Sequence, residues 1–155
     1  MLQVYKRMQK MREKYVDTLA KLYEYATTVY SKKQYTQWYD TKKGGYTYAS
    51  LKERCDSLSK VLTQYGIGAG DKVAILSQSM PNWSVAFFSL APYGRIVIPI
   101  LPDSSTNEVT NIINHSETKA IFVSQKLAGK ISQEVKEKMV LVIDVDTLEI
   151  IKSDD

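Results

Sequence analysis

Four short apolar runs constrain the fold of this chain more than any other feature. They lie in the segments 72–77, 96–101, 120–123 and 139–145, and their apolar residues follow one another without regular polar alternation. A strand exposed on one face alternates apolar and polar residues, whereas a strand covered on both faces does not. Segments with helical spacing separate the runs, which predicts right-handed βαβ units. We therefore expect an α/β fold: a partial doubly wound, mostly parallel sheet flanked by helices, with a short fifth strand at 148–151.

The helices expected before and between these strands carry recognisable start and stop signals. Thr47 is a good N-cap, and Gly66 followed by Ile67 suits a Schellman ending. Pro81 fits a first helical turn, and Pro92 predicts a kink or an early end before Gly94. The expected inward-facing residues are Leu51, Cys55, Leu58, Leu62 and Tyr65 in the first helix, Trp83, Phe87, Leu90 and Ala91 in the second, and Leu127, Ile131 and Val135 in a helix over 125–138. A capping box at Ser105 and Glu108 opens a further helix, and Pro99 predicts an edge position, a bulge or a strand exit.

The N-terminal third differs in character from the rest. Residues 1–43 hold ten Lys or Arg against four Asp or Glu, and nine of the eleven tyrosines lie in residues 1–48. Apolar spacing predicts a helix over 2–30. The pattern of residues 35–48 predicts a β-hairpin, and we expect Trp38 to pack against the edge of the core rather than to bind a ligand. We divide the chain into a basic helical extension, 1–17, and an α/β subdomain, 18–155. For the extension, a solvated helical face is favoured over contact with an anionic membrane surface, and no nucleic-acid motif is found.

Composition narrows the class of protein. A length of 155 residues fits one domain or a large piece of one. No apolar run is long enough to cross a bilayer, and the N-terminus has no apolar signal region, so we expect a cytoplasmic protein. The single cysteine, Cys55, excludes an internal disulfide framework, and its place on an apolar stripe favours a core residue over a nucleophile.

The glycine series Gly66-x-Gly68-x-Gly70 first suggests a dinucleotide fingerprint. A phosphate-binding glycine loop follows a strand and opens a helix, so that helix amides face the anion. This series follows a helix and opens a strand, which predicts a turn at the N-terminal edge of the sheet.

Other candidate residues offer no complete constellation. His115 is the only histidine, just past a helix end, where a structural cap is favoured over a catalytic base. Asp144 and Asp146 flank a strand end, where a solvated terminus is favoured over a metal site. The Ser and Thr residues after Leu76 and Leu101 lie where ligands approach parallel sheets, but show no identified chemistry. We therefore predict no catalytic, cofactor-binding or metal-binding residue in this chain.

Taken together, an ordered set of short segments resembles the N-terminal part of the adenylate-forming superfamily, which comprises acyl-CoA synthetases, peptide-synthetase adenylation domains and luciferases. The matching residues are Tyr46-Thr-Tyr48, Leu51, Gly66-Ile67, Gly70-Asp71, Val73-Ala-Ile75, Pro81-Asn-Trp83, Gly94, Val97-Ile-Pro99, Pro102, Glu108, Ile112, His115-Ser116, Lys119 and Phe122-Val123. Pro81-x-Trp83 and His115-Ser-Glu117-x-Lys119 are most similar to long-chain fatty acid–CoA ligases. Where the family usually has Glu, this chain has Ser50, so we expect the capping box to be lost while the N-cap remains.

The resemblance implies an AMP-binding, ATP-binding ligase of fatty acid metabolism. The implied cofactors of the complete enzyme are ATP, Mg²⁺ and coenzyme A, but the family's phosphate loop and catalytic residues have no counterpart here. We therefore expect an N-terminal fragment that is inactive alone, with the remainder of its parent chain as partner and a homodimer through exposed sheet surface. Two alternatives stay open: a stand-alone binding or assembly module using the basic, tyrosine-rich N-terminal helix, and an amino-acid or aryl-acid adenylation domain.

Overall fold

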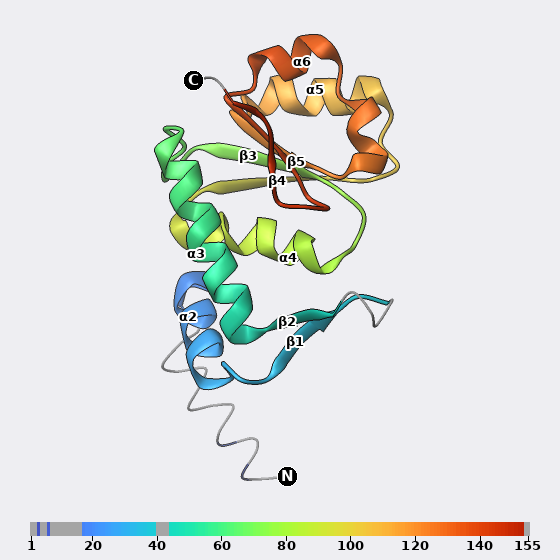
Figure 1. Cartoon of the computed structure of the whole chain (residues 1–155). Coiled ribbons are helices and arrows are strands. Elements are labelled where there is room, and N and C mark those ends of the chain that lie inside the picture. Colours follow the sequence, from blue (N-terminus) through green and yellow to red (C-terminus); the bar gives the residue numbers. More distant parts are fainter. Residues whose placement is uncertain (1–2, 4–5, 7–16, 40–43, 154–155) are drawn as a thin grey trace.

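The structure, a computed structural model, describes residues 3, 6, 17–39 and 44–153 (Figure 1). The predicted extension 1–17 therefore lies almost entirely outside the described residues, as does most of the predicted turn at 40–45. The helical elements are α2 (Leu19–Val29), α3 (Tyr48–Gln64), α4 (Pro81–Phe88), η2 (Ala91–Tyr93), α5 (Thr106–Ser116), η3 (Gln125–Lys130) and α6 (Gln133–Lys138). The strands are β1 (Gln34–Gln37), β2 (Gly45–Thr47), β3 (Lys72–Leu76), β4 (Ile96–Ile100), β5 (Ala120–Val123), β6 (Leu141–Asp144) and β7 (Ile150–Ser153).

A five-stranded sheet in the order β4-β3-β5-β6-β7 forms the centre of the fold. β3 pairs in parallel with β4 and β5, and β5 pairs in parallel with β6. The register places Ile75 opposite Pro99 on one side and Phe122 on the other. β1 and β2 form the predicted hairpin as a separate antiparallel pair. The predicted α/β class, with a parallel-rich sheet flanked by helices, is confirmed.

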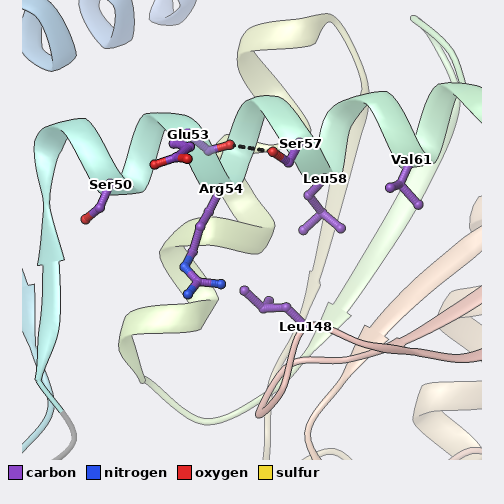
Figure 2. Close-up of a pocket in the computed structure, with 7 residues that line it drawn as sticks. All are labelled: Ser50, Glu53, Arg54, Ser57, Leu58, Val61 and Leu148. Atoms are coloured by element: carbon purple, nitrogen blue, oxygen red, sulfur yellow. Dashed lines mark hydrogen bonds between the residues drawn. The ribbon is translucent and has the colours of Figure 1, made fainter.

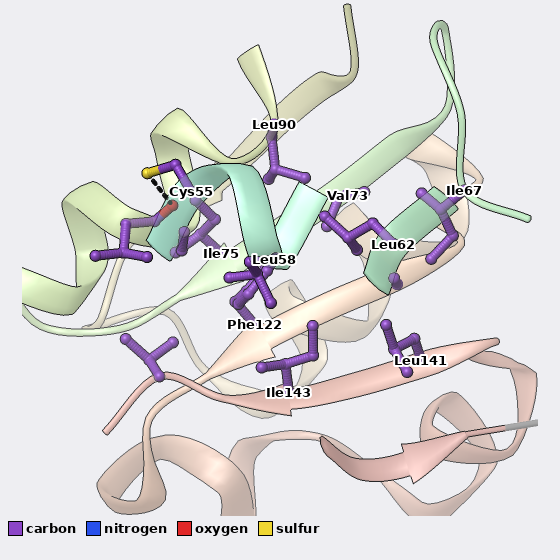
Figure 3. Close-up of a cluster of buried hydrophobic side chains, with 14 of the residues drawn as sticks. Cys55, Leu58, Leu62, Ile67, Val73, Ile75, Leu90, Phe122, Leu141 and Ile143 are labelled. Carbon is purple, nitrogen blue, oxygen red and sulfur yellow. Dashed lines mark hydrogen bonds between the residues drawn. The ribbon is translucent and has the colours of Figure 1, made fainter. Parts of the chain in front are cut away.

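Two apolar cores explain why the strand runs do not alternate. Val73 and Ile75 of β3 belong to the core beneath α3 and α4, whereas Ala74 and Leu76 belong to the core beneath α5 and α6. Figure 1 shows these two pairs of helices on opposite faces of the sheet, with α2 and the hairpin beyond α3 and α4. Figure 3 shows the first core, where Phe122 lies among side chains of the helices and neighbouring strands. Burial on both faces is what the uninterrupted apolar runs predict.

Local signals at the ends of α3 are largely confirmed, with one correction. The Thr47 hydroxyl accepts a hydrogen bond from the Ser50 amide at 3.2 Å, as expected of an N-cap. The Ser50 hydroxyl also accepts one from the Thr47 amide at 3.0 Å, so the expected loss of the capping box is wrong. A serine hydroxyl can accept here because it needs only one lone pair facing that amide. At the other end, Gly66 is left-handed (φ 73°), and the Ile67 amide donates to the Leu62 carbonyl at 2.9 Å, a Schellman ending.

Two predicted helices have different bounds in the structure. The predicted helix over 2–30 does not run unbroken through its described part, because Thr18 is extended and caps a new helix at Leu19. The predicted helix over 125–138 is divided into η3 and α6, because Ile131 is extended and Ser132 begins the second helix as its N-cap. Leu127, Ile131 and Val135 are nevertheless buried as expected. In this second helix apolar spacing identified the buried side chains correctly, but it did not detect the break between η3 and α6.

The second predicted helix, α4, faces the core differently from the prediction. Val85 and Ala86 are buried against the core, whereas Trp83 and Phe87 are only partly buried. Leu90 is buried as predicted, and the helix ends at Phe88, before Pro92. The assignment failed because α4 has apolar residues on more than one face, so its sequence does not mark which of these faces is buried.

The strands at the two edges of the sheet also differ from the prediction, in burial at one edge and in direction at the other. β4 is an edge strand, as Pro99 predicted, but Ile96 is 46% exposed and of the strand's residues only Ile100 is buried. The fifth strand, predicted at 148–151, is β7 and pairs antiparallel to β6. Leu148 adopts a left-handed conformation (φ 63°), and its amide donates to the Asp144 carbonyl at 2.7 Å, which reverses the chain before β7. Among the described residues, no helix is long and apolar enough to cross a membrane.

Candidate functional site

The glycine series lies at the N-terminal edge of the sheet, between α3 and β3. Gly66 and Gly70 have positive φ, and the Gly68 amide donates to the Asp71 carboxylate at 2.8 Å. The Gly70 amide donates to the Gly94 carbonyl, also at 2.8 Å. These amides are used within the protein, which confirms a turn rather than a phosphate loop.

Cys55 and His115 lie on opposite sides of the sheet. Cys55 is fully buried beneath α3, and its thiol contacts the Val85 carbonyl at 3.6 Å. Burial raises the pKa of this thiol to about 12, which confirms a core role rather than a nucleophile. His115 is exposed within the last turn of α5 rather than past its end, because Glu117, in a left-handed conformation, is the residue that ends the helix.

The C-terminal ends of β3, β5 and β6 meet at the edge of the sheet where open α/β folds bind ligands. Polar side chains interlock there. The Ser124 hydroxyl donates to the Gln78 side chain at 2.9 Å, and the Gln125 side chain donates to the Asp144 carboxylate at 2.6 Å. The other carboxylate oxygen of Asp144 accepts from the Asp146 amide at 2.7 Å. Asp144 is only 7% exposed, so the predicted solvated strand terminus is wrong for this residue.

Asn82 connects this edge to the hairpin, and sequence reasoning missed it. Its side-chain amide donates to the carbonyls of Val145 (2.7 Å) and Asp146 (3.0 Å), and its oxygen accepts from the Tyr46 hydroxyl at 2.5 Å. Asn82 is the second residue of α4, next to Pro81, and is 5% exposed. The one signal for Asn82 in the sequence is its position within the Pro81-Asn-Trp83 motif. That signal was not enough, because the motif does not reveal what the side-chain amide contacts.

Two adjoining cavities open beside this connection and share Arg54 and Leu148 in their walls. The larger, about 510 Å³, lies between α3 and the loop after β6 (Figure 2). The second, about 400 Å³, adds Trp38, Tyr46 and Asn82 to the wall. Both cavities border the loop after β6, at the edge where open α/β folds bind ligands.

The cavity walls offer groups for recognition. In Figure 2 the Arg54 side chain extends from α3 toward Leu148. The Arg54 guanidinium lies 5.6 Å from the centre of the Tyr46 ring, and no ion pair to it is found among the described residues. The Ser50 and Ser57 hydroxyls bond the backbone of Thr47 and Glu53, and His115 lies across the sheet from them. This arrangement can bind polar groups, but among the described residues it does not pair a nucleophile with a histidine base.

A second residue missed by sequence reasoning is Arg95, which is 5% exposed. Its guanidinium donates to the carbonyls of Ile67 (3.0 Å) and Ser59 (3.0 Å) and to the hydroxyls of Ser59 (2.8 Å) and Thr63 (2.9 Å). Burial lowers the pKa of Arg95 below its usual range. Because these partners lie at the end of α3 and in the turn after it, Arg95 is structural and joins this helix to β4.

A sequence model of the AMP-binding enzyme family matches residues 24–155. The chain belongs to this family. The resemblance to adenylate-forming enzymes expected from the sequence is thereby confirmed. Two curated AMP-binding relatives are fatty acyl-CoA synthetase A of Dictyostelium discoideum and a long-chain-fatty-acid–CoA ligase of Mycobacterium tuberculosis. The first is 25% identical over 95 residues, which cover 59% of this chain and 14% of that protein. The second is 31% identical over 76 residues, which cover 49% and 15%.

Solved structures of AMP-binding enzymes share the fold. A fatty acyl CoA synthetase of Mycobacterium tuberculosis aligns with a TM-score of 0.71 and 21% identity, over 84% of this chain and 27% of that one. The anthranilate CoA ligase AuaEII, in complex with anthranoyl-AMP, aligns with a TM-score of 0.75 and 16% identity, over 84% and 25%. The chain thus spans only a small part of the relatives that it matches.

Proposed function

We propose that this chain is the N-terminal scaffold of an ATP-dependent acid–CoA ligase that acts on a fatty acid. The observation that carries the proposal is the family match across residues 24–155. Relatives named as fatty acyl-CoA and long chain acyl-CoA synthetases support the choice of acid. In this reaction a carboxylate oxygen attacks the α-phosphorus of ATP, and pyrophosphate leaves. The thiol of coenzyme A then attacks the acyl carbonyl, and AMP leaves.

The role proposed for the described residues is structural. The interlocked side chains of Asn82, Asp144 and Gln125 hold the C-terminal edge of the sheet in one arrangement, which would form part of the wall around the acid. Across residues 17–39 and 44–153, no group of three or more His, Cys, Asp or Glu side chains could hold a metal ion. The proposal assigns no described residue to ATP, Mg²⁺ or coenzyme A and no chemical step to the described residues.

An ATP–pyrophosphate exchange assay tests the proposal. We expect no palmitate-dependent exchange from the 155-residue chain. We expect exchange from the polypeptide translated through the codons that follow Asp155, because the groups that contact ATP would lie there. Exchange by the shorter chain would refute its scaffold role, and exchange by neither polypeptide with any acid would refute the ligase proposal. Cell fractionation of the longer polypeptide tests the cytoplasmic location, which stays part of the proposal.

The same assay separates the alternatives. One structural relative is a ligase solved with anthranoyl-AMP, so aryl acids and amino acids belong in the substrate panel. Exchange with anthranilate and not with palmitate would favour an aryl-acid enzyme. The stand-alone assembly module depends on the basic, tyrosine-rich N-terminal helix predicted over 2–30, most of whose first half lies outside the described residues. A reading frame that stops after Asp155 would favour that module.

A further inference from the structure

Arg54 is a cation that the protein holds in place without an ion pair. Its guanidinium lies 5.6 Å from the centre of the Tyr46 ring, which is an attractive cation–π contact. The Tyr46 hydroxyl is in turn fixed by its hydrogen bond to the Asn82 side chain. Within the part of the chain that the structure describes, no carboxylate forms an ion pair with Arg54. Its positive charge is therefore positioned and available to a bound anion.

An apolar strip extends along α3 from Arg54. Leu58 and Val61 follow Arg54 by four and seven residues, which places the three side chains on one face of the helix. Figure 2 shows this face turned toward Leu148. Seven residues of α-helix rise by about 10 Å. The larger cavity, about 510 Å³, lies between this strip and Leu148, so it has one cationic end and one apolar end.

Leu148 closes the opposite wall of both cavities in a backbone conformation that is unfavourable for its side chain. Its φ of 63° lies in the left-handed region, which leucine rarely adopts. The hydrogen bond from its amide to the Asp144 carbonyl, 2.7 Å, accompanies this conformation. Strained residues of this kind are concentrated at active sites and ligand clamps. Leu148 is therefore placed to hold an apolar group against α3.

We propose that the two adjoining cavities bind a monocarboxylate with an apolar body, namely the anion of a medium-chain fatty acid. The carboxylate pairs with the Arg54 guanidinium, whose planar set of donors suits two parallel hydrogen bonds to a carboxylate. The hydrocarbon chain lies between Leu148 and the strip formed by Leu58 and Val61. The proposal goes beyond the proposed function and does not depend on it, because this binding needs neither ATP nor coenzyme A.

The charges of the cavity walls favour a ligand with a single negative charge. Among the described residues, Arg54 is the one cation in these walls, and the carboxylates of Glu53 and Asp146 lie there too. The Asp146 carboxylate accepts a hydrogen bond from the Gln125 amide at 2.8 Å. A phosphate monoester carries a charge of about −1.5 to −2, which one guanidinium beside two carboxylates would not balance. Nucleic acid requires several basic side chains.

An NMR titration of the ¹⁵N-labelled 155-residue chain with sodium octanoate tests the proposal. We expect the amide signals of α3 and of residues 146–148 to shift. Arg54→Gln should raise the Kd by roughly tenfold or more, because a hydrogen-bonded charge pair is lost. Lys60→Gln should leave the Kd within about twofold, because Lys60 is an exposed cation of the same helix outside both cavity walls. Octanol, which has no charge, should bind roughly tenfold more weakly than octanoate.

Ligand length tests the apolar end of the site. From butanoate through hexanoate to octanoate, each added methylene should tighten binding by about three- to fourfold. Leu148→Gly removes the apolar wall and keeps the left-handed backbone, because glycine adopts that conformation readily. This variant should weaken octanoate more than butanoate, so the affinity should depend less on ligand length. Circular dichroism verifies the folding of every variant.

Each other result overturns the proposal. No shifts at millimolar octanoate, or shifts outside α3 and residues 146–148, would remove the site. Equal affinities for octanoate and octanol would remove the role of the charge, and equal losses in Arg54→Gln and Lys60→Gln would indicate a general charge effect. Tighter binding of octyl phosphate than of octanoate would identify a phosphate site instead. Pyrophosphate exchange tests the ligase separately, so either proposal can fail while the other stands.

Discussion

Replacing Asn82 by alanine removes the connection between α4, the hairpin and the loop after β6. Three hydrogen bonds are lost: two to the carbonyls of Val145 and Asp146, and one from the Tyr46 hydroxyl. Each hydrogen bond contributes a net ~0.5–1.5 kcal/mol, and a buried group left without a partner costs ~1–3 kcal/mol. Because the bond to Val145 is buried, we expect Asn82→Ala to lower the free energy of unfolding by roughly 3–5 kcal/mol.

Urea denaturation followed by circular dichroism measures this loss, with an unchanged m-value as the control for a common unfolded state. In a double-mutant cycle with Tyr46→Phe, the coupling energy should be about 1 kcal/mol, since the two side chains share one hydrogen bond. Asn82→Asp should be worse than Asn82→Ala near neutral pH, because a carboxylate would face two carbonyl oxygens, and acid should restore part of the loss. A loss under about 1 kcal/mol, well below the sum of the removed bonds, would refute the reasoning.

Three further predictions follow from buried groups. Arg95→Lys should lower the free energy of unfolding in urea by about 2–4 kcal/mol, because one ammonium cannot replace the planar guanidinium that donates to Ser59, Thr63 and Ile67. An unchanged urea midpoint would contradict this. Cys55 should react with a thiol reagent only after unfolding, and rapid labelling of the folded chain would disprove burial. Burial raises the pKa of this thiol from 9.0 to about 12. The contribution of the protonated thiol to the free energy of unfolding should therefore be complete below pH 9 and fall as the pH rises toward 12. Among the described residues, the buried Tyr23 hydroxyl has no hydrogen-bond partner. Tyr23→Phe should therefore leave the free energy of unfolding equal or raise it by up to about 1 kcal/mol. A clear loss of stability in thermal denaturation would show that the hydroxyl has a partner.

The candidate site shows where sequence reasoning reached its limit. The C-terminal edge of the sheet was predicted as the side of ligand approach, and the two cavities that share Arg54 lie there. Asn82 was not identified because its partners are distant in sequence: Asn82 lies 36 residues from Tyr46 and 63 from Val145. Arg54 was not identified either, because its sequence position on α3 does not show that it lines a cavity with Leu148. Asp144 was expected in solvent, since a carboxylate at a strand end is usually exposed, and only the partner at Gln125 reveals why it is buried.

The sequence by itself determined the features that arise from local backbone chemistry. Thr47 begins a helix and Gly66 ends one because a side-chain acceptor and a missing Cβ act within a few residues. Uninterrupted apolar runs predicted cover on both faces, which holds for β3, β5 and β6, and Pro99 predicted an edge position, a bulge or a strand exit, of which the structure shows the edge. Tertiary structure alone decided which face of α4 is buried, and which buried polar groups find partners. The physical reason is that a helix with apolar residues on more than one face carries a weak directional signal, so its orientation is set by the layers that pack against it.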